Sequence, residues 1–125
     1  MSRKILIIDD NATNNAILAK RLEKNAFNVI TTETCEKGLS LATTEIPDLI
    51  LLDLVLPDMT GWELIETIRT LNSINHIPVI AVSSTISDLD RDRLEFAGFN
   101  GYCVKPIKAS ELVRKIPKWL SINKK

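Results

Sequence analysis

The sequence has few cysteines, no excess of charge of either sign and no apolar run long enough to span a membrane. Cys35 and Cys103 form no CxxC pair and do not suggest a disulfide-stapled fold, so we expect two reduced thiols. Lysine plus arginine and aspartate plus glutamate number 16 each, and the formal net charge of +0 gives no electrostatic footprint for nucleic acid or anionic lipid. The start, MSRKILIIDD, lacks the small-residue cleavage region of a signal peptide. We therefore expect a cytoplasmic protein with no membrane insertion and no direct contact with nucleic acid.

A chain of 125 residues suits one domain, and a chain of this size buries roughly two thirds of its unfolded surface. Hydrophobic residues make up 45% and charged residues 26%, which is typical of a globular protein. We expect one domain over residues 1–125, with Lys124 and Lys125 as a frayed tail.

Short apolar runs alternate with segments of helical periodicity along the whole chain. The runs predict five strands, at 4–8, 28–32, 50–53, 79–82 and 101–104. Helices are predicted at about 14–25, 36–44, 62–71 and 109–120, with a further helix that Asp88 caps and Gly98 ends. In the first helix Ile17, Leu18 and Leu22 recur at the spacing of a buried face. Pro117 must bend the last helix or set its frame, since it loses one ladder bond.

The alternation predicts an α/β fold, a five-stranded parallel sheet with helices on both faces and right-handed crossovers. Ile50, Leu51 and Leu52 show no polar alternation, as expected of a strand covered on both faces.

Polar residues follow four of these strands, at the point where each strand ends. They are Asp9 and Asp10 after the first, Asp53 after the third, Ser83 after the fourth and Lys105 after the fifth. Because the carboxyl ends of parallel strands share one edge, where ligands bind in such sheets, we expect these side chains to gather there. Taken singly, Asp53 could equally be a loop acid.

Three clustered carboxylates require a cation, because two unit charges about 4 Å apart repel by about 4 kcal/mol at an effective dielectric constant near 20. Oxygen ligands favour Mg²⁺, with Mn²⁺ as a substitute, and a lysine and a hydroxyl suit the oxygens of a phosphoryl group. The pattern therefore predicts phosphoryl transfer onto the carboxylate of Asp53.

With these residues in this order, and with the LPDMTG turn and Lys105-Pro106, the sequence resembles the receiver domains of bacterial two-component response regulators over essentially its whole length, in the stand-alone form of the chemotaxis regulator. The resemblance implies a flavodoxin-like (βα)5 fold with strand order 2-1-3-4-5. It also implies a phosphorelay protein that accepts its phosphoryl group from a histidine kinase or a histidine phosphotransfer protein and acts on a downstream protein target. Such a protein catalyses only its own phosphorylation and dephosphorylation.

The resemblance assigns a role to each site residue. It implies that Asp53 is the phosphorylated residue and a metal ligand, that Asp10 binds Mg²⁺ directly, that Asp9 acts through water, and that the main-chain carbonyl of Val55 completes the protein ligands.

Lys105 is implied to pair with the phosphoryl group, Ser83 to move toward it, and Tyr102 to be an aromatic switch. The face that changes would comprise the fourth helix, the fifth strand and the last helix. Without the resemblance, Tyr102 could be plain strand packing.

Three other functions fit parts of the pattern. An aspartate-nucleophile phosphohydrolase of the haloacid-dehalogenase type would need a second acid at the Val55 position. A metal-binding interaction module that is never phosphorylated would not need Asp53, Ser83 and Lys105 together. A flavin carrier would want a phosphate-cradling loop after the first strand, where this chain has acids.

Overall fold

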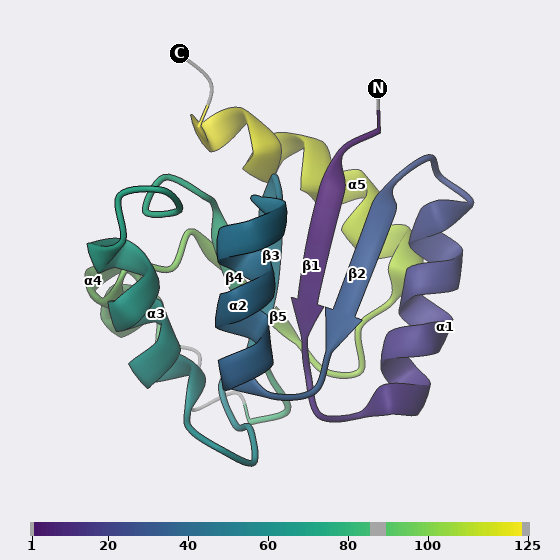
Figure 1. Cartoon of the computed structure of the whole chain (residues 1–125). Coiled ribbons are helices and arrows are strands. Elements are labelled where there is room, and N and C mark those ends of the chain that lie inside the picture. The colour runs from purple at the N-terminus through teal and green to yellow at the C-terminus, as the bar shows by residue number, and fades with distance from the viewer. Residues whose placement is uncertain (1, 86–89, 124–125) are drawn as a thin grey trace.

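In a computed structural model of the chain, which describes residues 2–85 and 90–123, five strands alternate with five helices. The strands are β1 (Lys4–Ile8), β2 (Asn28–Thr32), β3 (Leu49–Asp53), β4 (Val79–Ser83) and β5 (Gly101–Val104). The helices are α1 (Ala12–Glu23), α2 (Cys35–Glu45), α3 (Gly61–Thr70), α4 (Arg91–Ala97) and α5 (Ala109–Leu120), followed by a 3-10 turn, Ser121–Asn123. The strands pair in parallel in the order β2-β1-β3-β4-β5, which confirms the predicted topology (Figure 1).

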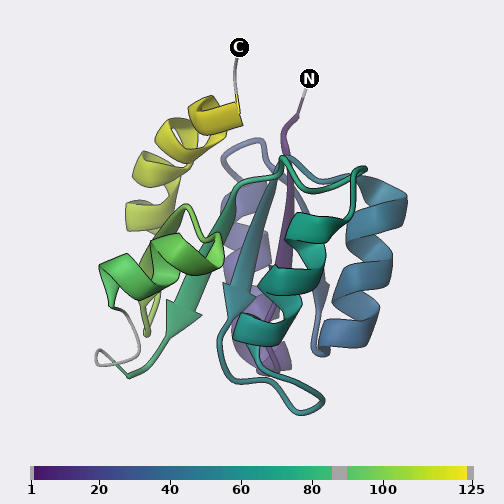
Figure 2. The same ribbon diagram turned by 90° about the vertical axis from the view of Figure 1, so that its left-hand side faces the viewer.

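The sheet has a separate core on each face because alternate side chains of a strand point to opposite sides. Leu6 and Ile8 of β1 and their neighbours on β3 pack against α2, α3 and the α4 residue Leu94. Ile5 and Ile7 lie on the other face, in the core that α1 and α5 cover (Figure 2). The four residues of β3 before Asp53 are at most 1% exposed, which explains why the sequence there shows no polar alternation.

The buried face of α1 differs from the prediction. Leu22 is fully buried, but Ile17 is 51% exposed, and the second buried residue of the helix is Asn15. Leu18, half-buried, lies three residues after Asn15, so the face toward the sheet runs through positions 15, 18 and 22.

The short helix α4 packs on α3 through a few specific contacts. The guanidinium of Arg93 lies 4.2 Å from the ring centroid of Trp62, and Trp62 meets Phe99 edge to face. At the other end Arg69 donates to the carbonyl oxygen of Gly98 at 2.7 and 3.0 Å. Phe96 of this helix is 96% exposed.

The ends of the helices follow their local chemistry. Asp90 caps α4 and Gly98, with a φ of 112°, ends it. The predicted cap Asp88 lies outside the described residues. Pro117 lies in the last turn of α5, which continues to Leu120.

Cys35 and Cys103 are free thiols, and burial raises their pKa values to about 12 and about 11. No helix in the described part of the chain combines the length and the apolarity of a membrane span.

Gly61 brings the start of α3 against the end of β3. Its amide donates to the carbonyl oxygen of Leu54 at 2.9 Å, and a Cβ at this position would lie 2.5 Å from the carbonyl oxygen of Asp53. We expect Gly61→Ala to lower the free energy of unfolding by about 1–3 kcal/mol in urea titrations, because rigid backbone would have to move. Gly38→Ala in α2 is the control: its Cβ would meet side-chain atoms of Ile8, the terminal methyl at 2.6 Å and Cγ1 at 2.9 Å, rather than backbone, and alanine favours the helix, so we expect a smaller loss. An equal or greater loss in the control would contradict this role of Gly61.

Candidate functional site

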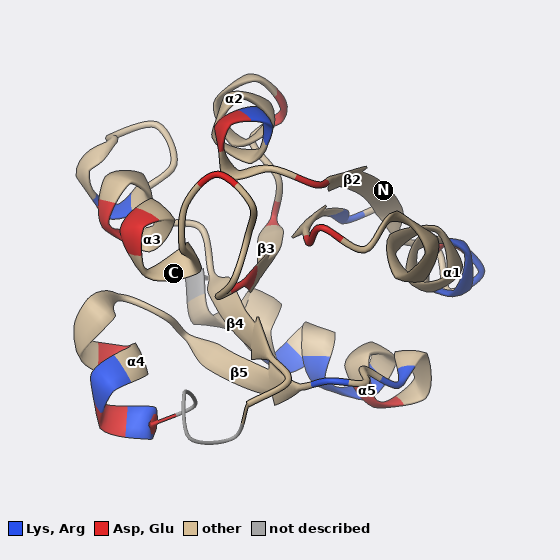
Figure 3. Ribbon diagram, turned by 90° about the horizontal axis from the view of Figure 1, so that it is seen from below, with Lys and Arg blue, Asp and Glu red and all other residues tan. Residues whose placement is uncertain are grey.

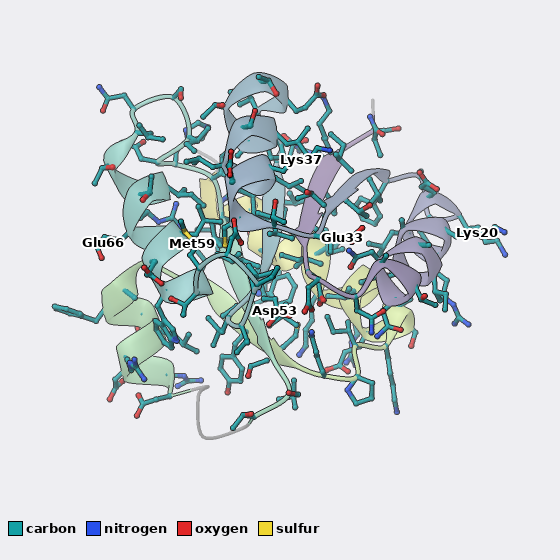
Figure 4. All side chains as sticks on the ribbon, turned by 60° about the horizontal axis from the view of Figure 1, so that its bottom comes forward. Lys20, Glu33, Lys37, Asp53, Met59 and Glu66 are labelled. Atoms are coloured by element: carbon teal, nitrogen blue, oxygen red, sulfur yellow. The ribbon has the colours of Figure 1, made fainter. Side chains whose placement is uncertain are left out.

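The acids that follow β1 and β3 meet at the carboxyl edge of the sheet because these strands are neighbours. Ile8 pairs with Leu52, so the residues after them come side by side. Carboxylate oxygens of Asp9, Asp10 and Asp53 all lie within 4.8 Å of one another. Asp9 and Asp53 are buried, whereas Asp10 is exposed. Figure 3 looks onto this edge, and Figure 4 shows Asp53 at its centre.

Lys105 contacts both buried acids. It follows β5, the edge strand that lies beyond β4 in the sheet. Its Nζ lies 2.7 Å from Oδ2 of Asp53 and 2.9 Å from Oδ2 of Asp9. Its own main-chain amide donates to the carbonyl oxygen of Ser83 at 2.9 Å, which continues the pairing of β4 with β5. The sequence prediction that these strand ends converge is therefore confirmed for Asp9, Asp10, Asp53 and Lys105.

Burial dominates the electrostatics of Asp53. It raises the pKa of this carboxyl above its ordinary value, although hydrogen bonds from Lys105 and from the amide of Val55 act in the opposite direction. Burial alone would lower the pKa of Lys105, but its hydrogen bonds to Asp53 and Asp9 outweigh burial and raise it. The lysine therefore stays charged, while the carboxylate of Asp53 is left only partly compensated.

The donor set fits a hard divalent cation. Octahedral Mg²⁺ holds oxygens at about 2.1 Å, so its ligands lie roughly 3 to 4 Å apart, close to the spacing of the three carboxylates. Asp10 enters no hydrogen bond or ion pair among the described residues, so its oxygens are available to a metal. Val55 lies on the exposed loop beyond β3.

The other predicted site residues differ in their contacts with this cluster. Ser83 is buried at the end of β4, but its hydroxyl interacts with its own loop, accepting from the amide of Thr85 at 3.1 Å. The amide of Val55 donates to Oδ1 of Asp53 at 3.0 Å. Tyr102 is 39% exposed on β5 and lines a second pocket, which also includes Lys115 and Trp119 and does not reach Asp53.

The residues that hold the loops after β1 and β3 were not identified from the sequence. In the turn after β1, Oδ1 of Asp9 accepts from the amide of Asn11 at 3.0 Å. The main-chain carbonyl oxygen of Asp9 accepts from Nδ2 of Asn15 at 2.7 Å. The one available signal for Asn15 was its position, three residues before Leu18 and seven before Leu22, on the buried face of a helix.

The loop after β3 is held in a similar way. Both oxygens of Asp58 accept from main-chain amides at the start of α2, Cys35 at 3.0 Å and Glu36 at 2.9 Å, and these bonds lower the pKa of Asp58. Thr60 and Glu63 form a capping box at the start of α3, a pattern that the sequence did contain.

A pocket of about 480 Å³ opens beside the acids, between α1 and the segment that joins β5 to α5. Asp53 and Lys105 line this pocket together with Asn14, Ile17 and Ile107. A group of moderate size can therefore approach Asp53 from the α1 side.

The chain matches the family model of the response regulator receiver domain over residues 5–117. It is 31% identical over 120 residues to the polar-differentiation response regulator DivK of Brucella ovis, covering 96% of this chain and 98% of that protein.

Solved structures show the same fold. A CheY-like receiver domain protein of Methanospirillum hungatei is 29% identical with a TM-score of 0.88, covering 98% of this chain and 97% of that one. The receiver domain of a sensor histidine kinase of Pseudomonas aeruginosa, solved with a magnesium ion coordinated in its active site cleft, is 27% identical with a TM-score of 0.86, covering 97% and 99%. The match of the family model, the likeness of whole chains and the acidic edge of the sheet agree, and the chain therefore belongs to the response regulator receiver domain family, as a receiver of two-component signalling.

Proposed function

We propose that Asp53 accepts a phosphoryl group from a histidine kinase or a histidine phosphotransfer protein. The observation that carries the proposal is the position of Lys105, whose ammonium lies within 2.9 Å of carboxylates from two different strands, beside a third. In the transfer, the bond from phosphorus to the donor nitrogen breaks as the bond to a carboxylate oxygen of Asp53 forms. The pocket along α1 leaves room for the donor side chain.

Asp10, Asp53 and the carbonyl of Val55 would hold Mg²⁺ or Mn²⁺, and Asp9 would act through water. The bound ion would offset the repulsion among the carboxylates and accept an oxygen of the phosphoryl group. The amide of Val55 orients Asp53 through Oδ1. Lys105 would exchange its bond to Asp53 for one to a phosphoryl oxygen, and it can do so while it remains charged.

The output of the proposed switch lies at α4, β5 and α5. Ser83 would leave its bond to Thr85 and turn toward the phosphoryl group, and Tyr102 would then change position on β5. A downstream protein would recognise this face, where Phe96 is exposed and the pocket beside Tyr102 carries both acidic and basic side chains. We place this function in the cytoplasm and in one receiver domain over residues 1–125.

Family membership favours signalling over the phosphohydrolase alternative, and Val55 stands where that class needs its second acid. In our proposal the protein catalyses only its own phosphorylation and dephosphorylation. Steady turnover of many unrelated phosphate esters without a trapped phosphoprotein would favour the hydrolase instead.

With Mg²⁺ and acetyl phosphate, the protein should gain one acid-stable, base-labile phosphoryl group, seen by intact mass. Asp53→Asn should abolish the labelling, because the amide is a poor nucleophile. Asp92→Asn, which changes an exposed acid on α4, should label like the wild type. Unchanged labelling of Asp53→Asn would contradict the assignment of the nucleophile.

Mg²⁺ should raise the melting temperature, because the ion binds the folded chain only. At a concentration 100-fold above its Kd the stabilisation should be about 2.7 kcal/mol. Asp10→Ala should remove most of this response, as measured by thermal unfolding with and without the metal. A full Mg²⁺ response in this variant would exclude Asp10 as a direct ligand.

Without metal, Asp53→Asn should be more stable than the wild type at pH 7. The raised pKa means that the ionised carboxylate disfavours the folded state, and the amide carries no charge. The difference should shrink as the pH falls through the raised pKa toward the unfolded value of about 3.9, because the wild-type carboxyl then takes up a proton. Urea titrations at several pH values measure this, and an advantage that grows as the pH falls would show the opposite shift.

A further inference from the structure

Asn15 is a buried residue whose side-chain amide lies next to the acids at the edge of the sheet. Asn15, in the first turns of α1, is only 4% exposed and occupies a position on the face that otherwise carries Leu18 and Leu22. A buried amide costs free energy unless it is hydrogen-bonded, and an apolar side chain would suit this face better. The Nδ2 of Asn15 donates to the main-chain carbonyl oxygen of Asp9 at 2.7 Å.

That carbonyl belongs to the peptide unit that joins Asp9 to Asp10. Because a peptide unit is planar, a bond to its oxygen fixes the orientation of the whole unit, including the amide nitrogen of Asp10. The orientation of this plane sets where the side chain of Asp10 points. The bond from Asn15 therefore acts on Asp10 although the two side chains are not bonded to each other.

The rest of the turn is held from its other side. Oδ1 of Asp9 accepts from the amide of Asn11, whose own Oδ1 accepts from the amide of Asn14, both at 3.0 Å. The amide of Asp9 donates to the carbonyl oxygen of Thr32 at 3.0 Å. Bonds thus hold the residues on either side of Asp10.

We propose that Asn15 is a positioning residue for the metal site, which orients the Asp9–Asp10 peptide so that the carboxylate of Asp10 meets the ion. The proposal rests on the function proposed above, since it requires a cation at this edge. Mg²⁺ demands near-octahedral geometry at about 2.1 Å, so a small rotation of the peptide would cost affinity. Residues that orient the ligands of a metal typically change its affinity by about 10-fold to 100-fold when they are replaced.

The test compares Asn15→Leu with Thr13→Leu. Leucine has the same number of side-chain heavy atoms as asparagine but cannot donate to Asp9. Thr13 is an exposed residue in the first turn of the same helix, and it does not line the pocket beside the acids. Isothermal titration calorimetry of the metal-free proteins with Mg²⁺, after circular dichroism has shown that they are folded, should give a Kd at least about tenfold weaker for Asn15→Leu. The Kd of Thr13→Leu should stay within about twofold of the wild type.

A purely structural role would show a different pattern, in which Asn15→Leu lowers the urea midpoint without metal and leaves the Mg²⁺ affinity of the folded protein unchanged. That outcome would overturn the proposal. If the leucine variant does not fold, Asn15→Ala removes the donor without adding atoms and gives the same comparison. A wild-type protein that fails to bind Mg²⁺ would instead overturn the proposed metal site itself, so the two failures are distinguishable.

Discussion

The placement of one ammonium group between two buried carboxylates is the constraint on which the site depends. Asp9 and Asp53 come from adjacent strands, and like charges at such a distance repel by about 4 kcal/mol at an effective dielectric constant near 20. Lys105 offsets part of this repulsion, but burial still raises the pKa of Asp53. The carboxyl group of Asp10, the exposed member of the cluster, adds a third acid. The edge therefore keeps a deficit of positive charge, which a divalent cation would supply. Stability alone does not account for three acids at this point of the sheet.

The topology produces this arrangement with short connections. The strand order puts β1 beside β3, so the residues after Ile8 and Leu52 meet, and β4 and β5 bring Ser83 and Lys105 to the same edge. The loops that carry the acids are then fastened to the starts of helices: Asn15 fixes the turn after β1, and Asp58 ties the loop after β3 to α2. Metal ligation and phosphoryl transfer both need such preorganised side chains.

The sequence was sufficient to predict the α/β fold, because uninterrupted apolar strands that alternate with helices leave few other architectures. Three of the five strands begin and end at the predicted residues. It was also sufficient to predict that Asp9, Asp10, Asp53 and Lys105 lie close together, since the carboxyl ends of parallel strands share one edge. It failed where tertiary packing decides. Helical spacing alone cannot tell that Ile17 is about half exposed and that Asn15 is buried. Helical spacing also cannot predict the role of Asp58, because its partners at the start of α2 lie more than twenty residues earlier in the sequence, before β3.

The central claim, that this edge lets one carboxyl hold phosphorus, is tested most directly by locating the modified atom. Reduction of the acetyl phosphate-treated protein with borohydride converts an acyl phosphate of aspartate to homoserine, which tandem mass spectrometry assigns to a single position. We predict homoserine at position 53 and at no other acid. Homoserine at Asp9 or Asp10, or at no position in a protein that has bound Mg²⁺, would contradict it.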